Sequence, residues 1–169
     1  MSNTRKLQVS VAPWELKQAF KITGHVFVAP DLVQVAITEN GFTGHGEGAG
    51  VYYLAESGTS MLAQIESVRQ DIEQGADRHT LRQLLPHGGA RNALDCALWD
   101  LEAKQSGKSI WELTGITPGT TATAYTVGIN TPAEMARQAQ LLETNLIKVK
   151  LDSEIPLERI TAVCAARPD

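Results

Sequence analysis

Two lysines within one predicted strand are the residues whose types and spacing could do chemistry. In the segment LIKVKLD, residues 146–152, Lys148 and Lys150 interrupt an otherwise apolar run. Side chains two residues apart on a strand point to the same face, so the two ammonium groups share one side at a spacing of about 6–7 Å. The other side carries Ile147, Val149 and Leu151.

Two interpretations of this lysine pair are open. In a partly dry site, two like charges at this spacing each lower the other's affinity for a proton. A lysine in such a pair can act as a base near neutral pH. The alternative is an edge strand whose lysines face water and discourage aggregation, which is a common use of lysine. The spacing alone does not separate the two.

The lysine segment belongs to an alternation of predicted strands and helices that is typical of parallel β/α units. The four members are residues 122–129, 132–143, 145–152 and 155–166. Two parallel strands cannot bury a sheet by themselves, and a closed β/α barrel takes about 250 residues. We therefore expect residues 119–169 to be the beginning of a barrel domain, and the chain to be the front portion of a longer protein.

The pattern of residues 1–118 is different and predicts an α+β domain. Apolar and polar residues alternate in the first 50 residues, as in strands, and Asn40-Gly41 can supply the positive φ angles of a tight hairpin turn. From about residue 60 the apolar spacing becomes helical. The predicted helices cover residues 61–75, 77–86 and 90–107.

A glycine-rich stretch in the strand region could be mistaken for a nucleotide-binding motif. The letters GHGEGA, residues 44–49, match a Gly-x-Gly-x-x-Ala dinucleotide fingerprint. They follow a hairpin turn, however, and no helix opens at their end. We interpret the glycines as residues that let the strand bend toward a loop.

Composition and charge exclude several classes of protein. The 169 residues include 15 basic and 19 acidic ones, for a net charge of −4, and no basic stripe marks a nucleic-acid surface. No run approaches the roughly 20 apolar residues of a membrane span, and the first residues lack the apolar core of a signal peptide. Cys96 and Cys164 fall in apolar helical patterns, which predicts two buried, reduced thiols. We expect a cytoplasmic protein with a small-molecule partner.

Four segments together resemble one enzyme family. They are GFTGHGEGAG (41–50), ALDCALWDLEAKQSGKSIWELTG (93–115), AYTVGINTPAEMARQA (124–139) and the Lys-x-Lys of LIKVKLD. The arrangement resembles the muconate lactonizing and mandelate racemase branch of the enolase superfamily, whose members join an α+β capping domain to a (β/α)7β barrel. Within the branch, residues 124–139 look most like the dipeptide epimerases of the L-Ala-D/L-Glu type.

The resemblance implies an isomerase that removes the proton alpha to a carboxylate and stabilises the resulting enediolate on Mg²⁺. By this resemblance Lys150 is the base on one face of the substrate, and Lys148 lowers its proton affinity and contacts the carboxylate. The metal ligands and the second base would lie beyond this chain, so we assign no metal ligand here, including Asp152. The 169 residues alone are then expected to be inactive.

The resemblance also implies residues that contact the substrate, which would be a dipeptide. Tyr125 and Thr126 end the first barrel strand. Two loops of the capping domain, residues 20–27 and 50–57, would close over the barrel. Their candidate residues are Phe20, Ile22, His25 and Tyr52. For His25, a solvated loop position is the alternative.

Other functions of this family stay open at this point. Muconate cycloisomerase, succinylbenzoate synthase and acid-sugar dehydratase would keep Lys150 and differ in the loops and in the opposite-face group. A proposal of another class is a non-catalytic capping or binding module. A homo-oligomer is compatible with the sequence.

Overall fold

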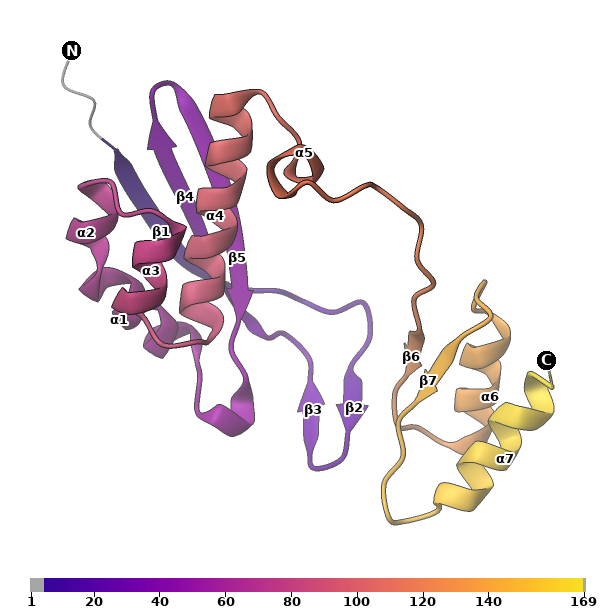
Figure 1. Cartoon of the computed structure of the whole chain (residues 1–169). Helices are drawn as coiled ribbons and strands as arrows, with labels where there is room; N and C mark the ends of the chain where they lie inside the picture. The colour runs from indigo at the N-terminus through magenta and orange to yellow at the C-terminus, as the bar shows by residue number, and fades with distance from the viewer. Residues whose placement is uncertain (1–4, 169) are drawn as a thin grey trace. The chain divides into compact units, whose positions relative to one another are not determined.

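The computed structural model describes residues 5–168, which divide into two compact units. The first unit contains Met1–Trp14 and Pro30–Pro118, and the second contains Glu15–Ala29 and Gly119–Asp169. In Figure 1, which is coloured by residue number, the second unit therefore combines a purple hairpin from the early part of the chain with orange and yellow helices from its end. A segment near the N-terminus therefore packs with the β/α units near the end of the chain.

The first unit contains an antiparallel sheet with the strand order β1-β4-β5. The strands are β1 (Lys6–Pro13), β4 (Asp31–Glu39) and β5 (Phe42–Ala49). Asn40 and Gly41 join β4 to β5 with φ angles of 55° and 81°, as the predicted hairpin turn requires. Alternation turns Val33, Val35 and Ile37 of β4 into the core, where each is at most 2% exposed.

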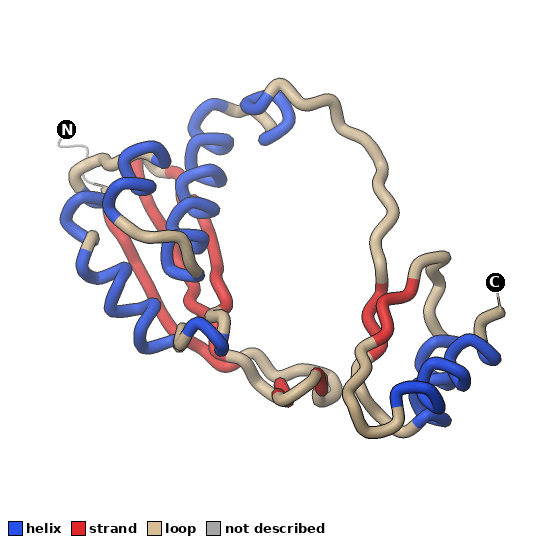
Figure 2. The backbone as a smooth tube through the Cα atoms, turned by 60° about the horizontal axis from the view of Figure 1, so that its bottom comes forward, coloured by secondary structure: helices blue, strands red, loops and turns tan. Residues whose placement is uncertain are grey.

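Helices cover one face of this sheet (Figure 2). Those that contact the strands are α1 (Gly58–Ser67), α2 (Arg69–Glu73) and α4 (Gly89–Ser106), and α3 (Arg78–Leu84) packs against α4. The short helices η1 (Tyr52–Leu54) and α5 (Ile110–Thr114) lie before α1 and after α4 in the chain. The single helix predicted from residue 61 to 75 is wrong in one respect, because the structure breaks it at Val68. The Ser67 hydroxyl donates to the backbone oxygen of Gln64 at 2.7 Å, which competes with the helical ladder at that point.

The glycines of β5 are explained by helix α4, which packs directly against this strand. A Cβ atom at Gly44, Gly46 or Gly48 would overlap a backbone oxygen of α4. The facing helix residues are also small, namely Ala97, Ala93 and Gly89. Our interpretation of GHGEGA as a bend was therefore incorrect: the glycines permit close approach of a helix, and no nucleotide-binding turn is formed.

The second unit contains a hairpin and two parallel β/α units. The hairpin strands are β2 (Phe20–Ile22) and β3 (His25–Phe27). The β/α units are β6 (Tyr125–Val127) with α6 (Pro132–Gln140), and β7 (Ile147–Val149) with α7 (Pro156–Ala166). The parallel pairing of β6 with β7 is as predicted, although each strand is only three residues long. Val127, Met135, Ala139 and Val163 form their shared core.

The two cysteines differ from their prediction. Both are free thiols and both are exposed. Cys96 lies on α4 between the buried residues Leu94 and Ala97, and Cys164 follows the buried Val163, so each is just off the apolar stripe of its helix. Among residues 5–168, no helix is both long and apolar enough to cross a membrane.

Candidate active site

The lysine strand has the two faces that its sequence predicts. Ile147, Val149 and Leu151 pack against the core formed with α6 and α7. Lys148 is exposed and Lys150 is half-buried. The strand β7 ends at Val149, but the backbone N–H of Lys150 still donates to the oxygen of Val127 at 3.0 Å. Lys150 therefore sits at the last point where β6 and β7 are held together.

Thr126 shares the face of the lysines, whereas Tyr125 does not. The parallel register places Thr126 beside Lys148 and Tyr125 beside Ile147. Neighbouring residues on a strand point to opposite faces, so Tyr125 lies on the side of Val127, which the helices cover. Tyr125 is 54% exposed there. The structure brings Thr126 together with the lysine pair and leaves Tyr125 on the other side of the strand.

The hairpin of residues 20–27 meets the ends of both parallel strands. The backbone oxygen of Lys21 accepts a 2.9 Å hydrogen bond from Ile129, two residues past β6. The Thr23 hydroxyl donates at 2.9 Å to the backbone oxygen of Leu151, the residue after Lys150. Gly128 lies so close to Phe20 that an added Cβ atom would stand 3.2 Å from its ring. A segment more than 100 residues away is thus seated beside Lys150.

Three of the predicted substrate residues lie on one face of this hairpin. Phe20 pairs with Phe27 and Ile22 pairs with His25, so their side chains share a side. The rings of Phe20 and Phe27 are stacked at 6.1 Å, and His25 meets Phe27 edge-on at 4.3 Å. All four residues are half-buried. His25 is consequently part of an aromatic surface rather than a solvated loop position.

Tyr52 belongs to the first unit, in the loop that contains η1. Its side chain is 40% exposed, and its ring meets that of Tyr53 edge-on at 5.2 Å. Glu56 fastens this loop, because its carboxylate accepts from the backbone N–H groups of Val51 and Gly89, each at 2.9 Å. The loop is therefore anchored to the start of α4.

Arg159 is a residue that the sequence interpretation missed. Of the described residues, it is the one buried charged side chain, at 5% exposure. Its guanidinium bonds the carboxylate of Asp152, the carboxylate of Glu154 at 3.3 Å and the backbone oxygen of Asn130 at 2.9 Å. A signal was present, since Arg159 precedes the buried Val163 by four residues and so shares its helix face.

The ion pair with Arg159 also explains the role of Asp152. One oxygen of its carboxylate accepts from Arg159 and from the backbone N–H of Glu154, the latter at 3.1 Å. Asp152 is thus engaged structurally and is not set up as a metal ligand. Between residues 5 and 168, no three His, Cys, Asp or Glu side chains are grouped so that they could hold a metal ion.

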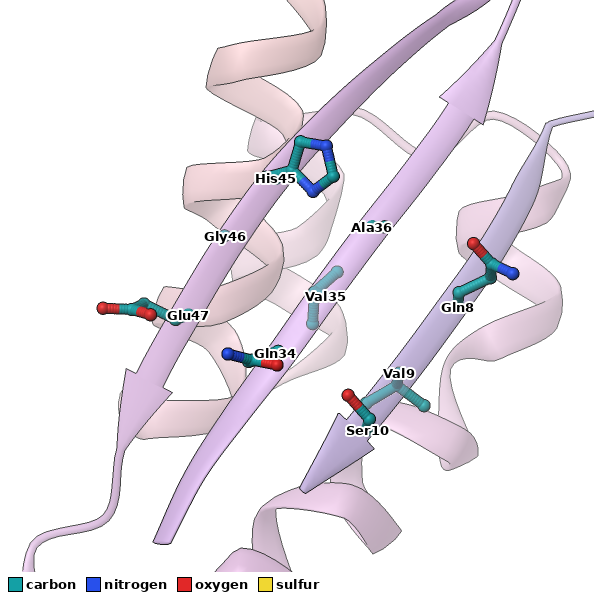
Figure 3. Close-up of a pocket in the computed structure, with 9 residues that line it drawn as sticks. All are labelled: Gln8, Val9, Ser10, Gln34, Val35, Ala36, His45, Gly46 and Glu47. Carbon is teal, nitrogen blue, oxygen red and sulfur yellow. The ribbon is translucent and has the colours of Figure 1, made fainter. Parts of the chain in front are cut away.

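A separate hollow lies on the open face of the first unit's sheet (Figure 3). Alternation directs polar side chains outward there, among them Gln8, Ser10, Gln34, His45 and Glu47. The backbone N–H of His45 donates to Asp100 at 2.7 Å. None of the residues of the lysine strand lines this hollow. It is the polar side of a half-covered sheet, and the candidate active site is the face of Lys148 and Lys150.

Comparison with known proteins gives a consistent result. The family described as mandelate racemase / muconate lactonizing enzyme, N-terminal domain, matches residues 4–115. The L-Ala-D/L-Glu epimerase of Escherichia coli (strain K12) is 42% identical over 169 residues, which are 98% of this chain and 53% of that protein. The chain therefore spans about half the length of the curated relatives it matches.

Two solved structures extend the comparison to ligands. An enolase family member from Agrobacterium tumefaciens, with homology to dipeptide epimerases, was solved with sodium and L-Ala-L-Glu. It is 34% identical with a TM-score of 0.91, over 97% of this chain and 51% of that chain. A mandelate racemase/muconate lactonizing enzyme relative from Roseovarius nubinhibens, complexed with magnesium, is 26% identical with a TM-score of 0.77, over 98% of this chain and 50% of that one.

Proposed function

This chain belongs to the mandelate racemase/muconate lactonizing enzyme family, and we propose that it is the N-terminal half of a dipeptide epimerase. The reaction would remove the proton alpha to a carboxylate and return a proton on the opposite face. The observation that carries the proposal is the position of Lys150, at the end of two parallel strands and beside an apolar hairpin. Similarity to the E. coli epimerase along almost the whole chain supports it.

Lys150 would be the base on one face of the substrate. It is half-buried at the strand end, where a docked hairpin limits access of water. Lys148, two residues before Lys150, lies beside Thr126 on the same face of the strands. Its ammonium group and the hydroxyl of Thr126 can together bind a substrate carboxylate. We propose no residue of this chain as the base on the opposite face of the substrate. This chain would therefore supply the base for one of the two proton transfers.

Mg²⁺ is the cofactor that we propose. A divalent cation stabilises the negative charge that develops when a proton is removed beside a carboxylate. The magnesium complex of the Roseovarius relative supports this choice. The described residues do not offer a donor set that fits Mg²⁺, because Arg159 engages the carboxylates of Asp152 and Glu154, and no three His, Cys, Asp or Glu side chains are grouped so that they could hold the ion. The proposal places the ligands outside the described residues.

The substrate that we propose is a dipeptide of the L-Ala-L-Glu kind. The ligand of the Agrobacterium relative and the activity of the E. coli relative support this choice. The aromatic and aliphatic face formed by Phe20, Ile22 and His25 lies over the ends of β6 and β7, so it can contact a substrate side chain held by the lysine pair. For Tyr52, which belongs to the first unit, a contact with the substrate stays a prediction from the sequence.

The test uses the full-length protein, meaning the complete product of the gene. It is assayed with a panel of L,L-dipeptides against muconate, succinylbenzoate precursors and acid sugars, following exchange of the alpha proton in D₂O. We expect exchange and epimerisation with dipeptides alone. Turnover of another substrate class with none of the dipeptides would overturn the proposal.

A single substitution then tests the role of the base. In Lys150→Ala, we expect exchange to be lost for the epimer whose proton faces Lys150 and retained for the other epimer. Unchanged exchange of both epimers would remove Lys150 from this role.

A further inference from the structure

Arg159 joins the loop after β6 to the loop after β7. Its Nε atom donates to Asn130, which follows the first strand, and its two terminal nitrogens bond Asp152 and Glu154, which follow the second. We propose that Arg159 is a positioning residue that holds Lys150 in place through Asp152. The proposal rests on the proposed function, because it takes Lys150 as the base.

The backbone is anchored on both sides of Lys150, and the two anchors differ in kind. On the N-terminal side, the ladder between β6 and β7 ends with the bond from Lys150 to Val127. On the C-terminal side no ladder continues, and the chain is held by Thr23 at Leu151 and by Arg159 at Asp152. Without the anchor on the C-terminal side, the segment after Lys150 would be free to move away from the strand ends.

The chemistry of the pair favours a specific role over general stability. A guanidinium that is 5% exposed has lost most of its hydration, and its attraction to carboxylates seldom exceeds that cost. An apolar residue at position 159 could fill the same place on the buried face of α7 without this cost. Arginine, in contrast, can bond three separate loop groups in one planar arrangement. The benefit of arginine is therefore that it fixes the positions of these loop groups relative to one another, and one of them, Asp152, is two residues from Lys150.

Substitution of Arg159 should have different effects if this residue only stabilises the packing of α7 than if it positions Lys150. If Arg159 only secures α7, its loss should weaken the unit and lower both half-reactions equally. If it positions Lys150, its loss should affect proton transfer on that lysine's face more than transfer on the opposite face. A displacement of about 1 Å at a reacting group can lower a rate on the order of 100-fold.

The experiment compares Arg159→Met, Arg159→Lys and Asp152→Asn with the unchanged full-length protein. Asp152→Asn is the mildest change, since it keeps the side-chain shape and removes only the charge. Arg137→Met is the matched control, because it breaks an ion pair with Glu134 on α6 where the arginine side chain is 58% exposed. Folding of each variant is checked by its thermal unfolding.

The first readout is amide hydrogen exchange at Lys150, which needs no activity. We expect the Lys150 amide to exchange on the order of tenfold faster in Arg159→Met and Asp152→Asn, and at the original rate in Arg137→Met. Arg159→Lys, which keeps the charge but not the planar fork, should fall between these. An unchanged Lys150 amide in both Arg159→Met and Asp152→Asn would overturn the positioning role.

The second readout is exchange of the substrate's alpha proton from each epimer in D₂O. Arg159→Met should lower exchange on the order of 100-fold for the epimer whose proton faces Lys150, and much less for the other. Equal losses for both epimers would overturn the proposal and would show that Arg159 only stabilises the unit as a whole. If the unchanged protein exchanges no dipeptide proton, the proposed function fails, and the amide readout still decides for or against the role of Arg159.

Discussion

The hydroxyl of Thr23 donates a 2.9 Å hydrogen bond to the backbone oxygen of Leu151, 128 residues further along the chain. This contact fixes the tip of an N-terminal hairpin to the residue that follows Lys150. The same hairpin accepts a bond from Ile129 at Lys21, so it is tied to the ends of both parallel strands. The hairpin residues that we propose to select a substrate side chain and the lysine that we propose to move a proton are thereby held in one unit.

Thr23→Val should loosen the hairpin without changing its shape, because valine replaces the hydroxyl by a methyl group. We expect KM for a dipeptide to rise about fivefold in the full-length protein, as the loss of one hydrogen bond of about 1 kcal/mol would give. Steady-state kinetics measure this effect. Thr114→Val is the control, since that hydroxyl bonds only within α5. An unchanged KM in Thr23→Val would show that hairpin docking does not contribute to binding.

The two faces of the hairpin should differ in their effect on substrate selection. Ile22 lies on the face of Phe20 and His25, whereas Val26 lies on the opposite face and is 49% exposed. Ile22→Phe should change the ratio of kcat/KM between a small and a large dipeptide by about tenfold, a change typical of one altered pocket contact. Val26→Phe adds similar bulk on the other face and should leave the ratio unchanged. Equal effects of both would contradict a role of this face in selection.

Local signals in the sequence predicted much of this fold. Asn40-Gly41 specifies a hairpin turn by itself, and the helix end at Gly107 needs only the positive φ that glycine allows there. The parallel β/α units also follow from local patterns, because the periodicity changes between strand and helix within a few residues. These features depend on neighbours in the chain, so a single sequence is sufficient to predict them.

The features that were missed depend on contacts between distant segments. The glycines of β5 were assigned to a bend because nothing local reveals that α4 lies against them. Arg159 appears as an ordinary helix residue until Asn130 and Asp152 are placed around it. Tyr125 is a different case. Alternation along the strand already separates it from Thr126 and from the face of the lysines, and its role as a substrate contact stays a prediction.

Glu39 should make the stability of the protein depend on acidity. Both carboxylate oxygens accept from Arg5 at 3.2 Å, and this pairing lowers the pKa of Glu39 below its usual 4.5. A carboxylate whose pKa is lower in the folded state than in the unfolded state stabilises the folded state at pH values above the unfolded-state pKa. This contribution is lost as the pH falls from about 4.5 through the folded value.

Glu39→Gln should therefore lower the free energy of unfolding by about 1 kcal/mol at pH 7, and by less at pH 3. Urea unfolding of the full-length protein at both pH values measures the difference. Glu66→Gln is the control, because Glu66 pairs with Arg69 where the glutamate side chain is 43% exposed. That change should cost less than about 0.5 kcal/mol. A loss for Glu39→Gln that is the same at pH 3 and pH 7 would contradict the ion-pair account.

Gly46 should be among the positions of β5 that tolerate no side chain. A Cβ atom there would overlap the backbone oxygen of Ala93 and approach the Cβ of Cys96 to 3.0 Å. Neither a strand nor a helix backbone can move aside without losing its neighbours' hydrogen bonds, so the helix α4 would have to shift away from the sheet. Gly46→Ala should therefore lower the free energy of unfolding by about 2–3 kcal/mol.

The matched control for this change is Gly119→Ala, because no atom lies within 4 Å of an added Cβ at Gly119. It should change stability by no more than about 0.5 kcal/mol, as substitutions at open surface positions do. Urea unfolding of the full-length protein measures both changes. If Gly46→Ala were as stable as the control, close packing of α4 would not be the reason for glycine at this position. The sequence GHGEGA would then need another explanation, and bending of β5 would again be the simplest one.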